Sequence, residues 1–338
     1  MDQKKPQIAV LGAGSFGTAV ANLFSRKGLD VTLWAREPEV ALEMREKATN
    51  TPFFKGLALE PFDATSDISL ALRQKGAVVF AIPCQFLRAF LMKHKTKIAP
   101  DAVFINLAKG IEIKTLKTPH EIFIDIFGPA IKKRYCALSG PTFARELYHE
   151  VPTGAVIAST STKTAEKFQH MFSTRFFRLY ASNDLMGVEL GGALKNIMAI
   201  CVGIAEGLGY GLNTRAGLMT RCLHEMTELG LAMGAKQRTF AGLSGLGDLI
   251  LTCTGDLSRN RQVGLRLGRG EDINNIINSA QHVAEGVPTA KAVFGLNKKY
   301  KVPMPNAEHV YKILYQGMSP QEAVNRILSR ELKKEFLA

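Results

Sequence analysis

Short apolar runs alternate with helical patterns through the first half of the chain. Seven runs are rich in β-branched or aromatic residues and predict strands: Ile8–Leu11, Asp30–Trp34, Ala77–Ile82, Val103–Leu107, Tyr135–Ser139, Gly154–Ala158 and Phe176–Tyr180. Several of them are apolar at both odd and even positions, as expected where helices cover both faces of a parallel sheet. The alternation of strands and helices predicts a doubly wound α/β domain.

The pattern changes near Leu185, and helical periodicity dominates from there to the end. The predicted helices are Leu185–Leu208, Leu218–Met233, Asn260–Leu267, Thr289–Lys298, Ala307–Tyr315 and Pro320–Leu328. We therefore predict two domains, an α/β domain over residues 1–187 and an all-helical domain over residues 188–338.

Composition places the chain among ordinary globular proteins. It has 338 residues, of which 46% are hydrophobic and 22% are charged, and this balance excludes gross disorder. The formal net charge is +13, which favours anionic partners such as phosphorylated small molecules, nucleic acid or an acidic membrane. The basic runs are short and lack interleaved aromatic residues, so we expect solvated faces and no nucleic-acid partner.

The cysteines and histidines point to no structural metal or disulfide framework. The five cysteines are odd in number, widely spaced and without a C-x-x-C pair, so buried free thiols in a reducing compartment are expected. The seven histidines show no paired-ligand spacing, and we expect no metal site. No run reaches the ~20 apolar residues of a membrane span, and the polar start does not resemble a signal peptide. We expect a cytoplasmic protein.

A glycine-rich turn follows the first predicted strand. Gly12, Gly14 and Gly17 give the spacing G-x-G-x-x-G between the strand Ile8–Leu11 and a helical pattern. Gly12 suits a tight turn, Gly14 lets the backbone approach a pyrophosphate, and Gly17 allows close packing of helix on strand. This context favours dinucleotide binding by a Rossmann-like domain over an incidental turn, because a helix N-terminus offers free N–H groups to phosphates.

The second predicted strand ends at a basic residue. Arg36 lies 19 residues beyond Gly17, where NAD-specific sites usually carry an acid for the ribose 2′-hydroxyl. An arginine there suits a 2′-phosphate or stacks on adenine. We therefore expect NADP(H) to be preferred, with NAD(H) possible because Glu37 is adjacent. The alternative is that Arg36 is only a solvated residue at a strand end.

Two further segments follow predicted strands at their carboxyl ends, where open α/β sheets bind ligands. Lys109 follows Val103–Leu107 and is placed to meet an anion or a substrate oxygen, although a strand-end lysine is often only solvated. The small residues of Gly140–Ala144 follow Tyr135–Ser139 and would let a ligand lie close to the backbone. A plain glycine–proline turn explains them equally well.

Lys195 stands on an unusual helical face. Its neighbours three and four positions away are Gly191, Gly192, Met198 and Ala199, all small or apolar. Each helical glycine costs about 1 kcal/mol relative to alanine, so a close approach, of which a ligand is one candidate, must require them. A desolvated lysine has a lowered pKa and can exchange a proton near neutral pH. The alternative is a lysine whose stem lies in a helix–helix seam.

Two polar segments follow in the second half. Asp248 and Thr252 are four residues apart on one helical face, where an acid can orient an ammonium group, although Asp248 also suits a helix cap. Ser258 precedes a helical pattern and is followed by Arg259, an arrangement suited to a phosphate. A solvated basic turn competes with that interpretation.

Six segments together closely resemble the NAD(P)-dependent sn-glycerol-3-phosphate dehydrogenases of bacterial type. In order and spacing they are Gly12–Gly17, Ala108–Gly110, Gly140–Ala144, Glu189–Asn196, Gly245–Thr252 and Ser258–Asn260. The resemblance covers nearly the whole chain. It implies reversible hydride transfer between a nicotinamide cofactor and dihydroxyacetone phosphate, giving sn-glycerol 3-phosphate for phospholipid synthesis. It also implies a homodimer.

The resemblance further implies a role for each matching residue. Lys195 is the proton donor or acceptor, Lys109 polarises the ketone oxygen, and Asp248 and Thr252 orient the lysine and substrate. The implied substrate-binding residues are Lys109, Gly140, Thr142, Lys195, Asn196, Asp248, Ser258, Arg259 and Asn260. The implied cofactor-binding residues are Gly12, Gly14, Ser15, Phe16, Gly17, Arg36, Lys109, Ala144, Arg259, Val283 and Glu285.

Two other functions stay open on the residues alone. One is another two-domain NADP-dependent keto- or hydroxy-acid reductase, against which the Ser258–Asn260 cluster argues. The other is a non-catalytic NADP(H)-sensing protein, which would not need Lys195 within an apolar helix.

Overall fold

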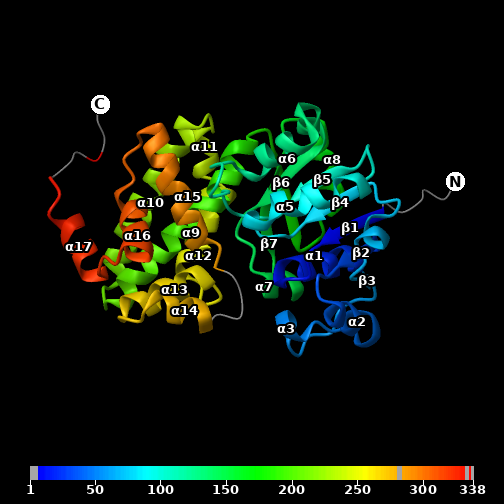
Figure 1. Cartoon of the computed structure of the whole chain (residues 1–338), viewed down its shortest axis with the longest axis horizontal. Coiled ribbons are helices and arrows are strands. Elements are labelled where there is room, and N and C mark those ends of the chain that lie inside the picture. Colours follow the sequence, from blue (N-terminus) through cyan, green and yellow to red (C-terminus); the bar gives the residue numbers. More distant parts are fainter. Residues whose placement is uncertain (1–6, 280–283, 332–334, 336–338) are drawn as a thin grey trace.

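The computed structural model describes residues 7–279, 284–331 and 335. Figure 1 shows an α/β domain beside a helical domain, with α17 at the far end of the helical domain. The fold prediction is confirmed in both parts: a Rossmann-like domain precedes an all-helical one.

The eight strands of the described residues form one sheet in the order β3-β2-β1-β4-β5-β6-β7-β8. Their bounds are β1 Gln7–Leu11, β2 Asp30–Trp34, β3 Asp63–Thr65, β4 Ala77–Phe80, β5 Val103–Asn106, β6 Tyr135–Ser139, β7 Thr153–Ala158 and β8 Phe177–Ser182. The sequence missed β3, because three residues are too few to show a period. It pairs in parallel with β2, from Thr32↔Asp63 to Trp34↔Thr65.

The sheet is parallel except at one junction. β7 runs antiparallel to β6, with Leu138 opposite Ile157, whereas β8 is parallel to β7. The link between β6 and β7 contains one short helix, α7 Ala144–Tyr148, which packs on α1. Because no long helix crosses the sheet here, the chain returns in the opposite direction.

Helices cover both faces of the sheet. Alternate residues of β1 point to opposite sides: Ile8 and Val10 belong to one core cluster and Ala9 and Leu11 to another. The helical segments before the domain junction are α1 Ser15–Arg26, α2 Pro38–Lys47, α3 Thr51–Phe54, α4 Ile68–Leu72, α5 Cys84–His94, η1 Lys95–Lys97, α6 Pro119–Phe127, η2 Pro129–Arg134, α7 and α8 Thr162–Phe172. The first core holds side chains of α1, α2 and α8, and the second holds those of α4, α5 and α6.

The second domain is built around α9 Leu185–Gly207. The other helical segments are α10 Leu212–Ala232, α11 Gln237–Phe240, η3 Leu243–Gly247, α12 Asp248–Thr254, α13 Arg259–Gly268, α14 Ile273–Ser279, α15 Gly286–Tyr300, α16 Pro305–Gln316 and α17 Pro320–Leu328. α9 is the one helix of the described residues long and apolar enough to cross a membrane, and its most apolar stretch is wholly buried within the protein. It therefore serves as the core of this domain.

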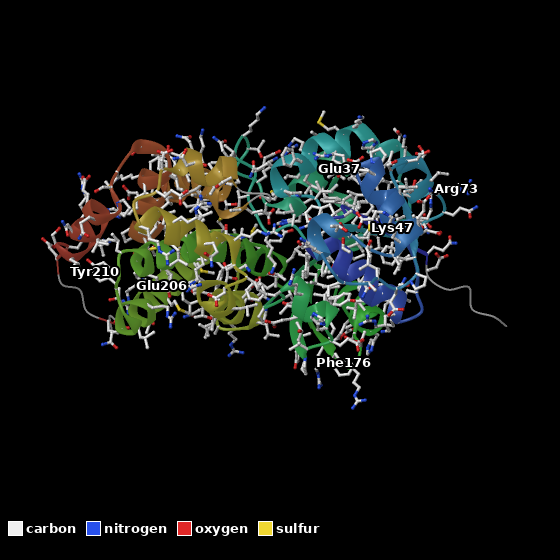
Figure 2. The ribbon with its side chains drawn as sticks, turned by 90° about the horizontal axis from the view of Figure 1, so that it is seen from below. Glu37, Lys47, Arg73, Phe176, Glu206 and Tyr210 are labelled. Atoms are coloured by element: carbon white, nitrogen blue, oxygen red, sulfur yellow. The ribbon has the colours of Figure 1, made fainter. Side chains whose placement is uncertain are left out.

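Glycines bring α13 into backbone contact with α9. A Cβ on Gly264 would lie 2.2 Å from the Ile200 carbonyl oxygen, and one on Gly203 would lie 2.3 Å from the Arg261 carbonyl oxygen. Beside this seam, Glu206 of α9 pairs with Arg261 of α13 and with Arg215 of α10, each at 2.7 Å. Figure 2 shows Glu206 in the helical domain, away from Glu37 and Lys47 of the α/β domain.

We expect Gly264→Ala to lower the free energy of unfolding by about 2 kcal/mol. Overpacking of this kind costs ~1–3 kcal/mol, and the helix propensity of alanine offsets at most about 1 kcal/mol of it. Gly217→Ala is the matched control, because that glycine of α10 has open space around its Cβ position. It should leave stability unchanged or raise it by up to about 1 kcal/mol. Urea unfolding measures both, and equal stabilisation by the two variants would show that the seam tolerates a methyl group.

Candidate active site

A cleft of about 520 Å³ lies between the two domains. The carboxyl ends of β5 and β6 deliver Lys109 and Thr142 to it, α1 delivers Ser15 and Phe16, and the helical domain closes the far side. Its lining residues are Ser15, Phe16, Thr51, Pro52, Phe53, Lys55, Leu107, Lys109, Thr142, Phe143, Ala144, Arg145, Lys195, Asn196, Thr252, Leu257, Ser258, Arg259, Asn260 and Glu285.

A buried carboxylate joins two lysines at the back of the cleft. The Nζ of Lys109 donates to Oδ2 of Asp248 at 2.7 Å, and the Nζ of Lys195 donates to Oδ1 at 2.5 Å. Asp248 is fully buried, and both lysine side chains are nearly so. The cluster therefore carries two cations against one anion, and its surplus positive charge faces the cleft.

Two further contacts fix the ammonium groups. Lys195 also donates to the Thr252 hydroxyl at 2.7 Å, and that hydroxyl donates to the Asp248 carbonyl oxygen at 2.6 Å. Lys109 also donates to the carbonyl oxygen of Gly140 at 3.0 Å. Asp248 is the first residue of α12 and makes no capping bond, so the structure favours the charge-orienting interpretation over a helix cap.

Burial lowers the pKa of Lys195 to about 8, because the charged form loses its hydration. The carboxylate of Asp248 opposes this shift, and the positive charge of Lys109 adds to it. An ammonium with this pKa is mostly protonated at neutral pH and gives up its proton more readily than an exposed lysine. Lys195 thus suits general acid and base chemistry.

The position of Lys195 is set through its helix. Glu189, six residues earlier on α9, accepts from the Tyr135 hydroxyl at 2.5 Å and from the His120 backbone N–H at 3.1 Å. The His120 ring contacts the same carboxylate at 2.6 Å. Although burial alone would lower the pKa of His120, the charge of Glu189 raises it. These contacts fasten the start of α9 to the sheet.

The close approach predicted from the two helical glycines is present, and the atoms that approach belong to the protein. A Cβ on Gly191 would lie 2.4 Å from the carbonyl oxygen of Ser244, in the segment before Asp248. A Cβ on Gly192 would lie 2.7 Å from the Ser139 hydroxyl and 3.3 Å from Cγ of Lys109. The glycines make room for parts of the protein that bring Lys109 and Asp248 to Lys195.

A chain of side-chain amides connects the two domains beside the lysines. The N–H of Gly286 donates to Asn260, the Asn260 amide donates to Asn196 at 3.0 Å, and the Asn196 amide donates to the Lys109 carbonyl oxygen at 3.2 Å. One N–H of each asparagine amide takes part. The second N–H of each is left for a ligand, since both residues line the cleft.

The glycine turn fits the pyrophosphate of a dinucleotide. Gly12 has φ +115° and a Cβ on it would lie 2.6 Å from the Ala81 carbonyl oxygen, while a Cβ on Gly17 would lie 2.0 Å from that of Gly12. Around Gly14, in contrast, the Cβ position is open to 4 Å. Gly14 is the N-cap of α1, which has no capping side chain and no acid in its first turn. Free N–H groups and open space are what a phosphate needs there.

The opposite wall of the cleft begins at the N-terminus of α13. The Ser258 hydroxyl caps this helix by accepting from the Arg261 N–H, as predicted. Arg259 reaches across the cleft and donates to the Ser15 hydroxyl at 3.0 Å. Burial lowers the pKa of Arg259, and the charge of Glu285 opposes that shift. Arg259 therefore joins the dinucleotide turn to the phosphate-binding candidate.

Glu285 is the acid of the cleft lining. Its carboxylate accepts from the backbone N–H of Cys84, at the start of α5. Burial raises its pKa, and that N–H and the nearby cations of Lys109, Lys195 and Arg259 oppose the shift. It also borders a smaller cavity of about 210 Å³ beside Phe86.

The structure brings most of the predicted residues together, but not all. Gly12, Gly14, Gly17, Gly140 and Asp248 are not among the lining residues, and Val283 is outside the described residues. Arg36 does not line the cleft: its side chain is 81% exposed and pairs with Glu37 at 2.5 Å. The sequence analysis also missed the wall made by Thr51, Pro52, Phe53 and Lys55, a segment whose only sequence signal was a proline at a helix start.

No group of three or more possible metal-ligating side chains occurs among the described residues.

Comparison with known proteins identifies relatives of the whole chain. Residues 7–165 match the model of the NAD-dependent glycerol-3-phosphate dehydrogenase N-terminus, and residues 184–325 match that of its C-terminus. A protein of Citrifermentans bemidjiense named glycerol-3-phosphate dehydrogenase [NAD(P)+] is 47% identical over 330 residues, covering 97% of this chain and 98% of its own. One of Solidesulfovibrio magneticus with the same name is also 47% identical, covering 97% and 100%.

Solved structures agree. The crystal structure of glycerol-3-phosphate dehydrogenase from Coxiella burnetii superposes with a TM-score of 0.91 at 35% identity, covering 96% of this chain and 99% of that one. A ketopantoate reductase of Ralstonia eutropha shares the fold at a TM-score of 0.56 and 15% identity.

We expect Asp248→Asn to destabilise the protein by about 3–5 kcal/mol at pH 7, since two buried ammonium groups lose their counter-charge. Part of the loss should be recovered by pH 9, because Lys195 sheds its proton more readily without the carboxylate while the unfolded chain keeps it. Denaturant unfolding at both pH values measures this.

Asp256→Asn is the matched control, since that carboxylate is 91% exposed and pairs with Arg261 at the surface. It should leave stability unchanged. A pH-independent loss in Asp248→Asn would show that the charge of Lys195 is not the cause.

Proposed function

The chain belongs to the NAD-dependent glycerol-3-phosphate dehydrogenase family, and from this we propose how its residues perform the reaction of that family. The enzyme is an NAD(P)-dependent oxidoreductase that interconverts dihydroxyacetone phosphate and sn-glycerol 3-phosphate. The product is the glycerol phosphate backbone of phospholipids. The observation that carries the assignment is the Lys109–Asp248–Lys195 cluster facing the cleft between the domains.

Lys195 is the proton donor in the reductive direction. The nicotinamide supplies hydride when bound, and the ketone oxygen needs a proton as its carbon is reduced. Lys195 suits this step, because its pKa is lowered to about 8 and Thr252 fixes its ammonium group. In the oxidative direction the neutral amine accepts the proton from the alcohol.

Lys109 polarises the ketone oxygen. Its ammonium is held by Asp248 and by the Gly140 carbonyl, so it offers a fixed positive charge at the end of β5. Charge placed in advance where negative charge develops lowers the barrier of the reaction. Asp248 keeps both cations in place, and Thr252 positions Lys195.

The substrate phosphate lies at the start of α13 in this proposal. Ser258, Arg259 and Asn260 offer a helix N-terminus, a guanidinium group and an amide N–H to it. Thr142 and Asn196 line the cleft between this helix and the two lysines, and the Gly140 carbonyl oxygen accepts from Lys109. We propose residues 1–187 as the dinucleotide-binding domain and residues 188–338 as the substrate domain. Val188 still packs in a sheet core and Leu190 packs in the helical core, so the change of core falls within three residues of this boundary.

The dinucleotide lies over Gly12, Gly14 and Gly17, with Ser15, Phe16, Ala144 and Glu285 around it and Lys109 and Arg259 at its substrate end. Val283 is proposed from the resemblance alone. Arg36 favours NADP(H), because its exposed guanidinium at the end of β2 is free to turn from Glu37 to a 2′-phosphate. The relatives' names cover both cofactors.

A homodimer in the cytoplasm is proposed on the family resemblance. The five cysteines are all free and buried, which is compatible with a reducing compartment.

Purified protein should oxidise NADPH and NADH when dihydroxyacetone phosphate is added, and Lys195→Met should not. We expect turnover of that variant to fall by a factor of about 10³, because proton transfer by a positioned group contributes about 10²–10⁴ to the rate. Cofactor binding, measured by the fluorescence of NADPH, should be retained. Loss of nicotinamide absorbance at 340 nm follows the reaction.

Lys93→Met is the control, because Lys93 is exposed on α5 and does not line the cleft. Near-normal turnover of Lys195→Met would remove this lysine from its role. Absence of turnover in the unmodified protein, with cofactor binding intact, would discard the substrate and leave the dinucleotide-binding fold.

Arg36→Ala should raise the KM for NADPH about tenfold and change the KM for NADH little. A charge-assisted contact with the 2′-phosphate is worth ~1.5–3 kcal/mol, and NADH lacks that group. The ratio of the two kcat/KM values, before and after substitution, measures the effect. Equal changes with both cofactors would show that Arg36 does not contact the 2′-phosphate.

A further inference from the structure

We propose that Lys55 and Arg145 form a cationic rim of the cleft that binds a phosphate group of a ligand held there. The proposal builds on the function above, which places two phosphorylated ligands in this cleft. Both residues line the cleft from the α/β domain, opposite the start of α13. Nothing in the motif analysis pointed to either of them.

The segment that carries Lys55 is anchored to the dinucleotide turn. The Asn50 amide donates to the Ala13 carbonyl oxygen at 2.9 Å and to the Thr18 hydroxyl at 2.8 Å. Glu43 of α2 accepts from the backbone N–H of Thr51 at 2.9 Å. Lys55 follows as the C-cap of α3, so its ammonium group extends from a fixed backbone beside the glycines.

Arg145 belongs to the same wall. It lies in the first turn of α7, which packs on α1. The ring of Tyr148 in α7 lies 5.8 Å from that of the fully buried Phe54 in α3, and its hydroxyl donates to the Ala58 carbonyl oxygen at 2.5 Å. α3 and α7 are therefore held together, and the two cations approach the cleft from neighbouring elements.

These two cations differ from the others of the cleft in having no partner. Lys109 and Lys195 are bound to Asp248, and Arg259 donates to Ser15. In the described part of the chain neither Lys55 nor Arg145 makes an ion pair or a side-chain hydrogen bond, and both are exposed. Unpaired exposed cations on the wall of a cleft attract an anionic ligand and are available to contact it.

A phosphate is the ligand that this chemistry fits. Its oxygens can accept from a point charge and a planar guanidinium at once. Three phosphate groups could enter: the pyrophosphate of the dinucleotide, the 2′-phosphate of NADP(H), and the phosphate of the triose. Each makes a different pattern of affinity changes, so one set of variants identifies the source.

The test uses Lys55→Gln, Arg145→Gln and their combination in the full-length protein. Binding of NADPH and of NADH is titrated by fluorescence, and binding of sn-glycerol 3-phosphate is titrated by calorimetry in the presence of reduced cofactor, with which it does not react. We expect each single variant to weaken one of these affinities about threefold to tenfold, the range of exposed charge-assisted contacts. The loss should shrink at high salt, and Lys55→Arg should retain the affinity.

Equal weakening for both dinucleotides identifies the pyrophosphate, weakening for NADPH alone the 2′-phosphate, and weakening for sn-glycerol 3-phosphate alone the triose phosphate. Arg73→Gln is the charge-matched control, since Arg73 lies at the outer end of the α/β domain and does not line the cleft (Figure 2). Three unchanged affinities, or the same losses in Arg73→Gln, would overturn the proposal.

This design distinguishes a wrong assignment of phosphate binding to Lys55 and Arg145 from a wrong assignment of the enzyme's function. Turnover of dihydroxyacetone phosphate by the unmodified protein tests the function, whereas the titrations need no turnover. If the protein binds dinucleotide and phosphate through Lys55 and Arg145 but does not reduce dihydroxyacetone phosphate, the rim proposal stands and the proposed function is overturned.

Discussion

The charge of a single buried carboxylate holds the active site together. Asp248 is fully buried, and an isolated buried charge is strongly unfavourable, so its carboxylate needs partners of opposite charge. Lys109 and Lys195 meet its two oxygens from different domains. These contacts stabilise the buried carboxylate, and they also place two cations beside the cleft. The same three side chains therefore determine both the stability of the cluster and the chemistry of the site, and loss of the Asp248 carboxylate would leave two buried ammonium groups without a counter-charge.

The rest of the fold serves to bring these three side chains together. β5 ends at the cleft and supplies Lys109, while α9 carries Lys195 out of the sheet domain into the helical core. Gly191 lets the segment before Asp248 approach α9 to within backbone contact, and Gly192 leaves room for the stem of Lys109. Glu189 fixes α9 against Tyr135 and His120. The small residues of α9 thereby allow Asp248 to bond to both lysines at less than 3 Å, although each lysine is more than fifty residues away in the sequence.

The sequence predicts this site well where chemistry and spacing coincide, and poorly where only tertiary contact decides. Lys195 could be singled out because a charged side chain on a small, apolar helical face is unusual, and the glycine turn because its spacing has a mechanism. The sequence could not show which atoms approach Gly191 and Gly192, because those atoms belong to distant parts of the chain. β3 has three residues and no period. The reversal of β7 depends on where α7 packs, which no local pattern records.

The cations of the cleft differ in burial, and because of solvation they differ in their partners within the protein. At its back, water is excluded, so each ammonium needs a permanent partner, and Asp248 provides it. Arg259 is exposed and spans the cleft to a neutral hydroxyl, a weaker partner that an anion can replace. At the rim, Lys55 and Arg145 keep their hydration and need no partner within the protein. An anionic ligand that enters the cleft therefore meets the unpaired cations of the rim first and the lysines bound to Asp248 last. Exposed basic side chains attract the ligand at the entrance. Buried basic side chains provide a fixed positive charge beside the reacting atoms.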